Sequence, residues 1–173
     1  MLKLHLGCGK IILPTWKNMD IEPGPMRIVF DLRSPIPEES DTVDYIYHEH
    51  FIEHLTRDEG IALFKECFRV LKKGGVMRFS TPDLHMLCIW YQQGKINQWP
   101  GTWEPKSNAQ FFNEAMRLWG HQFLYDTEEL GMILGELGFS HLLMEEYHNS
   151  EHDALREIEA RPYQRDIIME CTK

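Results

Sequence analysis

The sequence predicts an α/β domain with a mainly parallel sheet and helices on both of its faces. Strand-like and helix-like segments alternate along most of the 173 residues, which is the order that a parallel sheet requires. The chain is also long enough to bury a core, and 43% of its residues are hydrophobic. We therefore expect residues 1–173 to form a single domain.

Four short strand-like segments begin the chain. They lie at residues 3–6, 16–21, 27–32 and 43–47. About ten residues, including Pro14, connect the first two, which is the lower limit for a crossover that contains a helix. The next link is about half as long and cannot contain one. We therefore expect the N-terminal half of the sheet to be trimmed of its connecting helices.

An amphipathic helix follows, and both of its ends carry a signal. Thr56 and Glu59 have the spacing of a capping box, in which each side chain binds the backbone N–H of the other residue. Apolar residues then recur on one face, and Gly74-Gly75 is expected to end the helix. A fifth strand is expected at residues 76–80, directly after the glycines.

The segment 84–125 is predicted to be an aromatic-rich insert or cap. Its helical pattern is irregular, and it contains four of the five tryptophans: Trp90, Trp99, Trp103 and Trp119. These rings could stack on a sugar or a planar ligand, or they could form core or a dimer face. The segment is therefore compatible with a homo-oligomer.

One more helix and two strands complete the chain. Asp126 is the expected N-cap of this helix, and Gly138 is its expected end. The last strands, at residues 141–147 and 166–171, follow each other without a helix between them. We therefore expect an antiparallel edge at the C-terminal end of the sheet.

The composition argues against several classes of protein. The formal net charge is −9, opposite in sign to what nucleic-acid binders present. No apolar run approaches the roughly 20 residues of a membrane-spanning helix, and the N-terminus lacks a signal-peptide pattern. Cys8, Cys67, Cys88 and Cys171 have no metal-type or disulfide-type spacing. We expect a cytoplasmic protein with free thiols that binds neither nucleic acid nor membrane.

The candidate site begins where the first strand ends. Gly7-Cys8-Gly9 interrupts an alternating apolar run, and glycine permits both positive φ and close approach of a ligand to the backbone. Asp20 and Asp31 follow the second and third strands, and the carboxyl ends of parallel strands meet at one edge of a sheet. Each of these residues could instead have a purely structural role. The glycines could form a plain turn, Asp20 could form a turn, and Asp31 could cap one.

The order of motifs resembles a known family. LHLGCGK, Asp20, Asp31-Leu32, DYIYHEHFIEHL, FRVLKKGGVMRFSTPD and ELGF together resemble the small class I S-adenosylmethionine-dependent methyltransferases of the type 11 kind. The resemblance covers nearly the whole chain. It implies a Rossmann-like fold, S-adenosylmethionine as the cofactor and a small molecule as the methyl acceptor.

The resemblance also implies which residues contact the cofactor. The expected contacts are Gly7, Cys8 and Gly9 for the methionine moiety, Asp20 with Ile21 beside it for the ribose, Asp31 and Leu32 for the adenine, and His48 to His50 for the floor near the methyl group.

An oxygen acceptor would need a general base, and neutral histidine suits that role near pH 7. His50 is the first candidate, followed by His121 and His85, and each of them could instead be structural. The expected acceptor is an oxygen of a sugar, a glycan precursor or a secondary metabolite. A protein that binds the cofactor without methyl transfer, or that uses its sulfonium differently, is the alternative.

The same histidines fit one remote alternative. His50-Phe51-Ile52-Glu53-His54 has the H-x-x-E-H spacing of a class of zinc hydrolases. On one helix, His50 and His54 would share a face and hold a metal ion, with Glu53 as the base. The segment directly follows a strand, however, and helix capping begins only at Thr56. We therefore expect no metal here.

Overall fold

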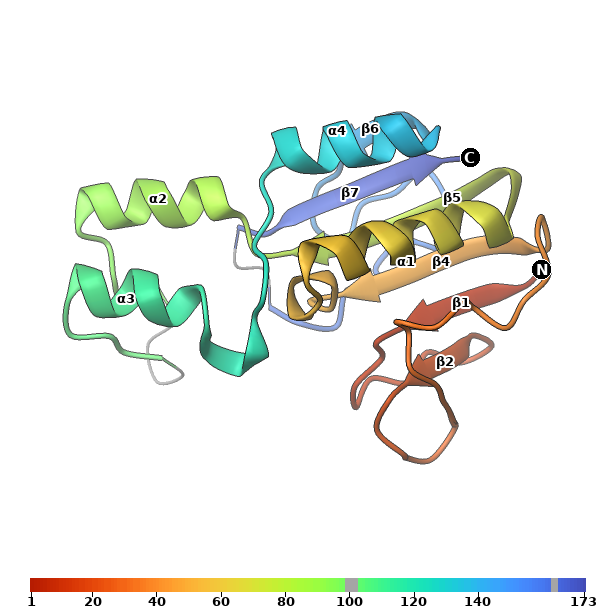
Figure 1. Cartoon of the computed structure of the whole chain (residues 1–173), viewed down its shortest axis with the longest axis horizontal. Coiled ribbons are helices and arrows are strands. Elements are labelled where there is room, and N and C mark those ends of the chain that lie inside the picture. The colour runs from red at the N-terminus through yellow and green to blue at the C-terminus, as the bar shows by residue number, and fades with distance from the viewer. Residues whose placement is uncertain (99–102, 163–164) are drawn as a thin grey trace.

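The computed structural model describes residues 1–98, 103–162 and 165–173, which contain one seven-stranded sheet (Figure 1). The strands are β1 (Lys3–Leu6), β2 (Lys17–Asp20), β3 (Arg27–Val29), β4 (Val43–Glu49), β5 (Leu71–Thr81), β6 (Ser140–Met144) and β7 (Ile167–Thr172). Their order across the sheet is β3-β2-β1-β4-β5-β7-β6, and only the two pairings of β7 are antiparallel. The α/β fold class and its antiparallel C-terminal edge are confirmed.

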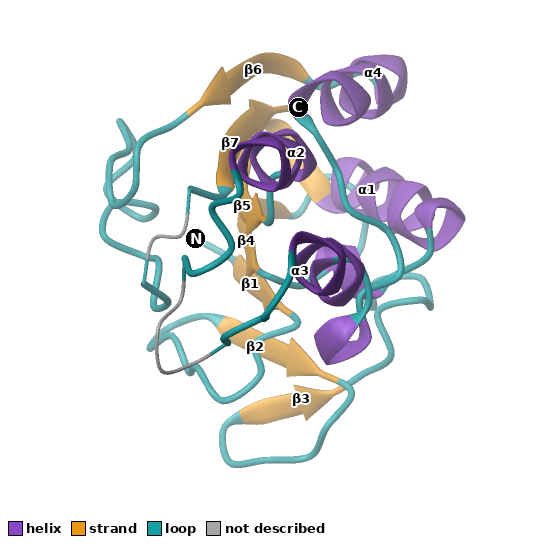
Figure 2. Ribbon diagram, turned by 90° about the vertical axis from the view of Figure 1, so that its left-hand side faces the viewer, coloured by secondary structure: helices purple, strands orange, loops and turns teal. Residues whose placement is uncertain are grey.

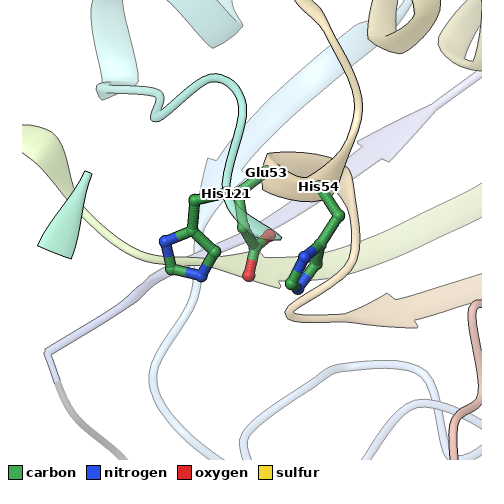
Figure 3. Close-up of side chains that lie close together, drawn as sticks. All are labelled: Glu53, His54 and His121. Carbon is green, nitrogen blue, oxygen red and sulfur yellow. The ribbon is translucent and has the colours of Figure 1, made fainter. Parts of the chain in front are cut away.

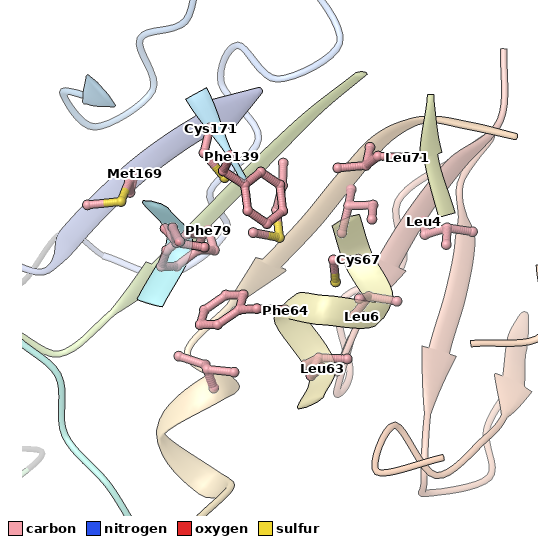
Figure 4. Packing of buried hydrophobic residues seen from close by; sticks show 14 of the residues in the cluster. Leu4, Leu6, Leu63, Phe64, Cys67, Leu71, Phe79, Phe139, Met169 and Cys171 are labelled. Atoms are coloured by element: carbon pink, nitrogen blue, oxygen red, sulfur yellow. The ribbon is translucent and has the colours of Figure 1, made fainter. Parts of the chain in front are cut away.

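Two helices cover one face of this sheet. α1 (Arg57–Val70) and α4 (Thr127–Leu137) lie side by side on it (Figure 2). The main core fills the layer between these helices and the strands, with Leu6, Phe64 and Phe79 all fully buried there (Figure 4). Burial of this apolar surface is the main force that holds the helices on the sheet.

The start of α1 agrees with the prediction, and its end does not. Thr56 and Glu59 form the capping box, in which the Thr56 backbone N–H donates to Glu59 Oε2 at 2.8 Å. The helix ends at Val70 because the next residue, Leu71, already pairs with Val43 of β4. Gly74-Gly75 therefore lies inside β5, where residues 72–75 loop out of the pairing between the two strands.

The opposite face differs from the expectation of helices on both faces. Leu13 and Trp16 from the β1–β2 link and Leu155 and Ile158 from the β6–β7 link belong to the apolar cluster around Tyr47 on this face. None of these residues lies in a regular helix. The β1–β2 and β2–β3 links contain no helix, as predicted for a trimmed N-terminal half. The β1–β2 and β2–β3 links are too short for a helical crossover. The β6–β7 link joins two antiparallel strands and needs no crossover helix.

A buried charge holds the β6–β7 link on this face. Arg78 of β5 has no exposed surface, and its guanidinium donates to Glu159 Oε1 at 2.6 Å and to Glu170 Oε1 at 2.7 Å. It also donates to the backbone oxygens of Asn149 and Glu146. Because one cation satisfies four acceptors, the link has a fixed path across the sheet.

α2 (Leu84–Gln93) and α3 (Asn108–Ala115) form a pair that extends beyond the carboxyl ends of the strands (Figure 1). The pair has its own apolar cluster, which includes Trp90 and Phe111. It lies within the segment 84–125, of which Trp99 falls outside the described residues.

The ends of α4 are as predicted, because the Asp126 side chain accepts from Glu129 N and Gly138 has a φ of 97°. The third strand is shorter than predicted and ends at Val29. Among the described residues, no helix has both the length and the apolar character that a membrane span requires.

Candidate active site

Contacts to β2 hold the glycine turn after β1. Gly7 and Gly9 have φ of 59° and 51°, which glycine adopts without the strain of a Cβ. A Cβ at Gly7 would also collide with the ring of Phe51. Gly9 N donates to Asp20 Oδ2 at 2.7 Å, and Cys8 N donates to a backbone oxygen of β2 at 3.1 Å. The turn thereby keeps the Asp20 carboxylate close to the half-buried backbone of Gly7.

A cavity of about 250 Å³, the smaller cavity, lies at the carboxyl ends of β1, β2 and β3. Five residues predicted to contact the cofactor line it: Gly7, Asp20, Ile21, Asp31 and Leu32. The other lining residues were not among the predicted cofactor contacts: Phe30, Arg33, Phe51, His54, Leu55 and Gln122.

The two carboxylates of this cavity are both held by hydrogen bonds. Asp20 Oδ1 accepts from Glu22 N at 2.9 Å, in addition to its bond from the glycine turn. The Arg33 guanidinium donates to both oxygens of Asp31 and holds the pKa of that carboxyl at about 2. Asp31 is therefore ionised at neutral pH. Asp20, with two hydrogen bonds, keeps lone pairs that can accept from the hydroxyl or amine groups of a ligand, whereas Asp31 accepts four hydrogen bonds from Arg33 alone.

Three of the predicted contacts do not line the smaller cavity. Cys8 is buried beneath the turn, and Gly9 uses its N–H to hold Asp20. His48 lies in the core, where its ring stacks on Phe79 with centroids 5.0 Å apart and burial lowers its pKa to about 3. Alternate residues of a strand face opposite sides of the sheet. His48 therefore points toward α1, and not toward the open edge where the cavity lies.

A second cavity of about 420 Å³, the larger cavity, lies between the ends of β4 and β5, the α2–α3 pair and the β6–β7 link. Its walls combine aromatic rings with titratable groups. They include Trp90, Trp103, Trp119, His50, His54, His121, Glu53, Asp83, Asp166, Arg161 and Arg165. His54 lines both cavities, so the two meet at this residue.

His50, the first candidate base, lies in the larger cavity between two carboxylates. Its Nδ1 is 3.4 Å from Glu53 Oε1, and its Nε2 is 3.2 Å from Asp166 Oδ2. Burial would lower the pKa of His50, but hydrogen bonds and charge from Asp166 and Glu53 outweigh this and raise the pKa to about 10. A protonated imidazole has no lone pair, so His50 here donates hydrogen bonds. His85, the third candidate, is exposed on α2 and lines neither cavity.

Glu53 links two distant segments at the floor of the larger cavity. It lies in the short 3-10 turn η1 (Ile52–His54) and is fully buried. Its Oε2 accepts from Thr81 Oγ1 at 3.0 Å, and its backbone oxygen accepts from Gln122 N at 2.8 Å. The second bond brings the segment after the 3-10 turn η2 (Leu118–Gly120) beside η1. His121 thereby comes close to Glu53 and His54.

His121, the second candidate base, has one ring nitrogen engaged. Its Nδ1 donates to the backbone oxygen of Ala115 at 2.9 Å, so in the neutral ring the lone pair is on Nε2. Burial is the main reason that the pKa of His121 is lowered. Its ring lies edge-on to that of His54, with centroids 5.1 Å apart. Figure 3 shows Glu53, His54 and His121 converging from two segments of the chain.

The geometry does not support the helical metal site of the remote alternative. His50 has a φ of 48°, and η1 begins only at Ile52. His50 and His54 therefore do not share a helical face. The histidine that joins Glu53 and His54 is His121, more than sixty residues along the sequence.

The sequence analysis missed the contribution of the β6–β7 link. Arg161 and Asp166 reach the larger cavity because the Glu49 carboxylate, at the end of β4, accepts from the backbone N–H groups of Ala160 and Arg161. The link has no motif of its own. Glu49, two residues beyond the predicted strand 43–47, was the one signal available in the sequence.

Comparisons with known proteins agree with this geometry. Residues 14–79 match the type 11 family model described as "Methyltransferase domain". The fold is similar to that of a SAM-dependent methyltransferase from Archaeoglobus fulgidus, with a TM-score of 0.62 and 16% identity over 99% of this chain and 85% of that chain. A SAM-dependent methyltransferase from Thermotoga maritima, titled a "possible histamine N-methyltransferase", gives the same score and identity over 99% and 81% of the two chains. The search of curated proteins found no match.

A third similar structure contains the cofactor. It is phosphoethanolamine N-methyltransferase 2 of Haemonchus contortus in complex with S-adenosyl-L-methionine, with a TM-score of 0.58 and 16% identity over 86% of this chain and 35% of that chain. At such identities the likeness establishes the fold, while the family match runs from before β2 into β5 and includes Asp20 and Asp31. By its partial family match and its fold, this chain is similar to the class I methyltransferases of the type 11 kind.

Proposed function

We propose that this protein binds S-adenosylmethionine in the smaller cavity and methylates a small molecule held in the larger one. The observation that carries the proposal is the meeting of the two cavities at His54. A methyltransferase needs its two substrates in adjoining sites, because the reacting atoms must approach in line.

The residues of the smaller cavity fit this cofactor. Gly7 lines this cavity with backbone atoms alone, which suits close approach of the methionine moiety. Asp20 already accepts from two backbone N–H groups, but a carboxylate has about four acceptor sites, which leaves room for ribose hydroxyls. Leu32 supplies apolar surface for the adenine beside Asp31, and Ile21 lies next to Asp20 at the proposed ribose position. The cofactor supplies a methyl group that is already electrophilic on its sulfonium.

An oxygen of a sugar, a glycan precursor or a secondary metabolite is the acceptor that we propose. The tryptophans of the larger cavity support it, because indole rings stack well on sugar rings and planar ligands. The acceptor hydroxyl would give up its proton beside the cluster of Glu53, His54 and His121. The lone pair on His121 Nε2 is the group there that can accept the proton. We also propose that the segment 84–125 acts as a cap over this cavity.

The remaining proposals concern setting and assembly. The four cysteines are free thiols, which supports a cytoplasmic location. The net charge of −9 argues against a nucleic-acid substrate. Tyr91 and Trp119 are 43% and 57% exposed on the proposed cap and would suit self-association.

Calorimetry with the demethylated cofactor, S-adenosylhomocysteine, tests the binding half of the proposal. Asp20→Ala should weaken binding roughly 10- to 150-fold, because a hydrogen bond to a charged group contributes about 1.5–3 kcal/mol and about 1.4 kcal/mol is tenfold in affinity. Glu22→Ala is the matched control, since its side chain lines neither cavity. Equal affinities of the two variants would remove Asp20 from the ribose site. Wild-type protein that does not bind would overturn the whole proposal.

Transfer of label tests the catalytic half. Wild-type protein with methyl-labelled cofactor should label members of a panel of sugars and phenols, with amines tested in parallel. Label on amines alone would refute the oxygen acceptor. Binding without any transfer would favour the alternative, a protein that binds the cofactor for another purpose.

A further inference from the structure

The cluster of Glu53, His54 and His121 has the composition of a metal site. Each residue offers one ligand atom, and these atoms all lie within 4.8 Å of one another (Figure 3). Two imidazole nitrogens and one carboxylate oxygen form a donor set that divalent transition metals bind in proteins. All three side chains line the larger cavity.

Glu53 has an oxygen left for a cation. Its Oε2 accepts from Thr81, while its buried Oε1 makes no close hydrogen bond among the described residues and has only the longer ion pair with His50 Nδ1, at 3.4 Å. A buried carboxylate oxygen with one long contact has lone pairs left over, and a metal ion would satisfy them. His50 also lies 3.2 Å from Asp166 Oδ2 through its Nε2, so it keeps this contact when Glu53 binds a metal ion.

His121 is oriented as metal-bound histidines usually are. Its Nδ1 donates to the backbone oxygen of Ala115, which fixes the tautomer and leaves Nε2 to coordinate. The backbone also fixes the distance between the two segments, because Gln122 Nε2 donates to the backbone oxygen of His54 at 2.6 Å. The hydrogen bonds of His121 and Gln122 to backbone oxygens therefore hold His121 and His54 in place for coordination.

We propose that Glu53, His54 and His121 bind one divalent transition-metal ion at the junction of the two cavities. Three protein ligands leave coordination positions open, and these would face the larger cavity. On the basis of the proposed function, an acceptor hydroxyl would occupy one of them and lose its proton to solvent, because a bound cation lowers the pKa of its ligand oxygen. The lone pair of His121 then binds the ion and does not itself take the proton.

Metal binding to the full chain tests this inference without any methyl transfer. Chelator-treated protein is titrated with Co²⁺, whose visible absorption reports imidazole ligands, and with Zn²⁺ by calorimetry. Wild-type protein should bind one ion per chain. His121→Ala and His54→Gln should each lose more than the roughly 10–100-fold in affinity that removal of an outer-shell partner costs. His141→Ala, on exposed β6, is the control and should bind as wild type does.

The outcomes separate this inference from the proposed function. Melting curves show whether each variant is folded. If His121→Ala does not fold, His54→Gln provides the test. Equal weak binding by wild type and both variants would overturn the metal site, as would a cobalt spectrum that His121→Ala leaves unchanged. Chelator-treated protein that still transfers label at its full rate would refute the role of the ion and leave the methyltransferase proposal standing.

Discussion

Replacing Arg78 should destabilise the protein more than replacing any exposed arginine. In Arg78→Met, the Glu159 and Glu170 side chains, only 1% and 5% exposed, would lose the cation that neutralises them. Breaking a buried ion pair by removing one partner costs about 3–5 kcal/mol. For a chain of this size, about 1 kcal/mol shifts the melting temperature by about 2–4 °C, so we expect a fall of roughly 6–20 °C.

Thermal and urea unfolding measure this effect against a matched control. Arg57→Met removes an ion pair of the same 2.6 Å length, to Glu129, but the arginine side chain is 45% exposed. Exposed pairs contribute about 0–1 kcal/mol, so the control should melt within about 4 °C of wild type. Adding Glu159→Gln and Glu170→Gln to Arg78→Met should recover part of the loss. Equal shifts in Arg78→Met and Arg57→Met would refute the assignment of Arg78 as the residue that fixes the β6–β7 link.

Two further predictions concern stability. Thr56→Ala removes the capping box of α1 and should lower the free energy of unfolding by about 1 kcal/mol, which is a fall of about 2–4 °C in melting temperature. An unchanged melting temperature would contradict the cap. His48→Phe should make the protein less sensitive to acid. The pKa of His48 is about 3 when folded and about 6.5 when unfolded, so wild type loses up to about 1.4 kcal/mol per pH unit as pH falls from about 6.5 toward 3. Denaturant unfolding at a series of pH values should give a shallower slope for the variant, and identical slopes would refute a buried, neutral His48.

Signals that act over a few residues predicted their structures well. The capping box at Thr56 and Glu59 forms as expected, and so does the glycine turn beside Asp20. Both depend on hydrogen bonds between neighbours in sequence or between adjacent strands, which a short segment specifies by itself. The end of α1 was misplaced because pairing of Leu71 with Val43, a contact across the sheet, overrides the helix propensity of the residues before Gly74.

The direction in which individual side chains point, into the core or into a cavity, was harder to predict. His48 and His50 are two residues apart, yet one lies in the core and the other in the larger cavity. A strand places alternate residues on opposite sides, but His50 has left the strand with a positive φ of 48°. Its side chain therefore follows neither the strand alternation nor a helical face.

The sequence by itself determined the fold class, the trimmed half of the sheet and the acids at the ends of β2 and β3. These follow from periodicity, link length and the geometry of parallel strands, all of which are local. Only the tertiary structure decided that His121 lies beside Glu53 and His54, and that Asp166 contacts His50. Those contacts join residues far apart in the chain through loops that have no regular period. Their paths are set by long-range bonds such as those of Arg78 and the Glu53 backbone oxygen.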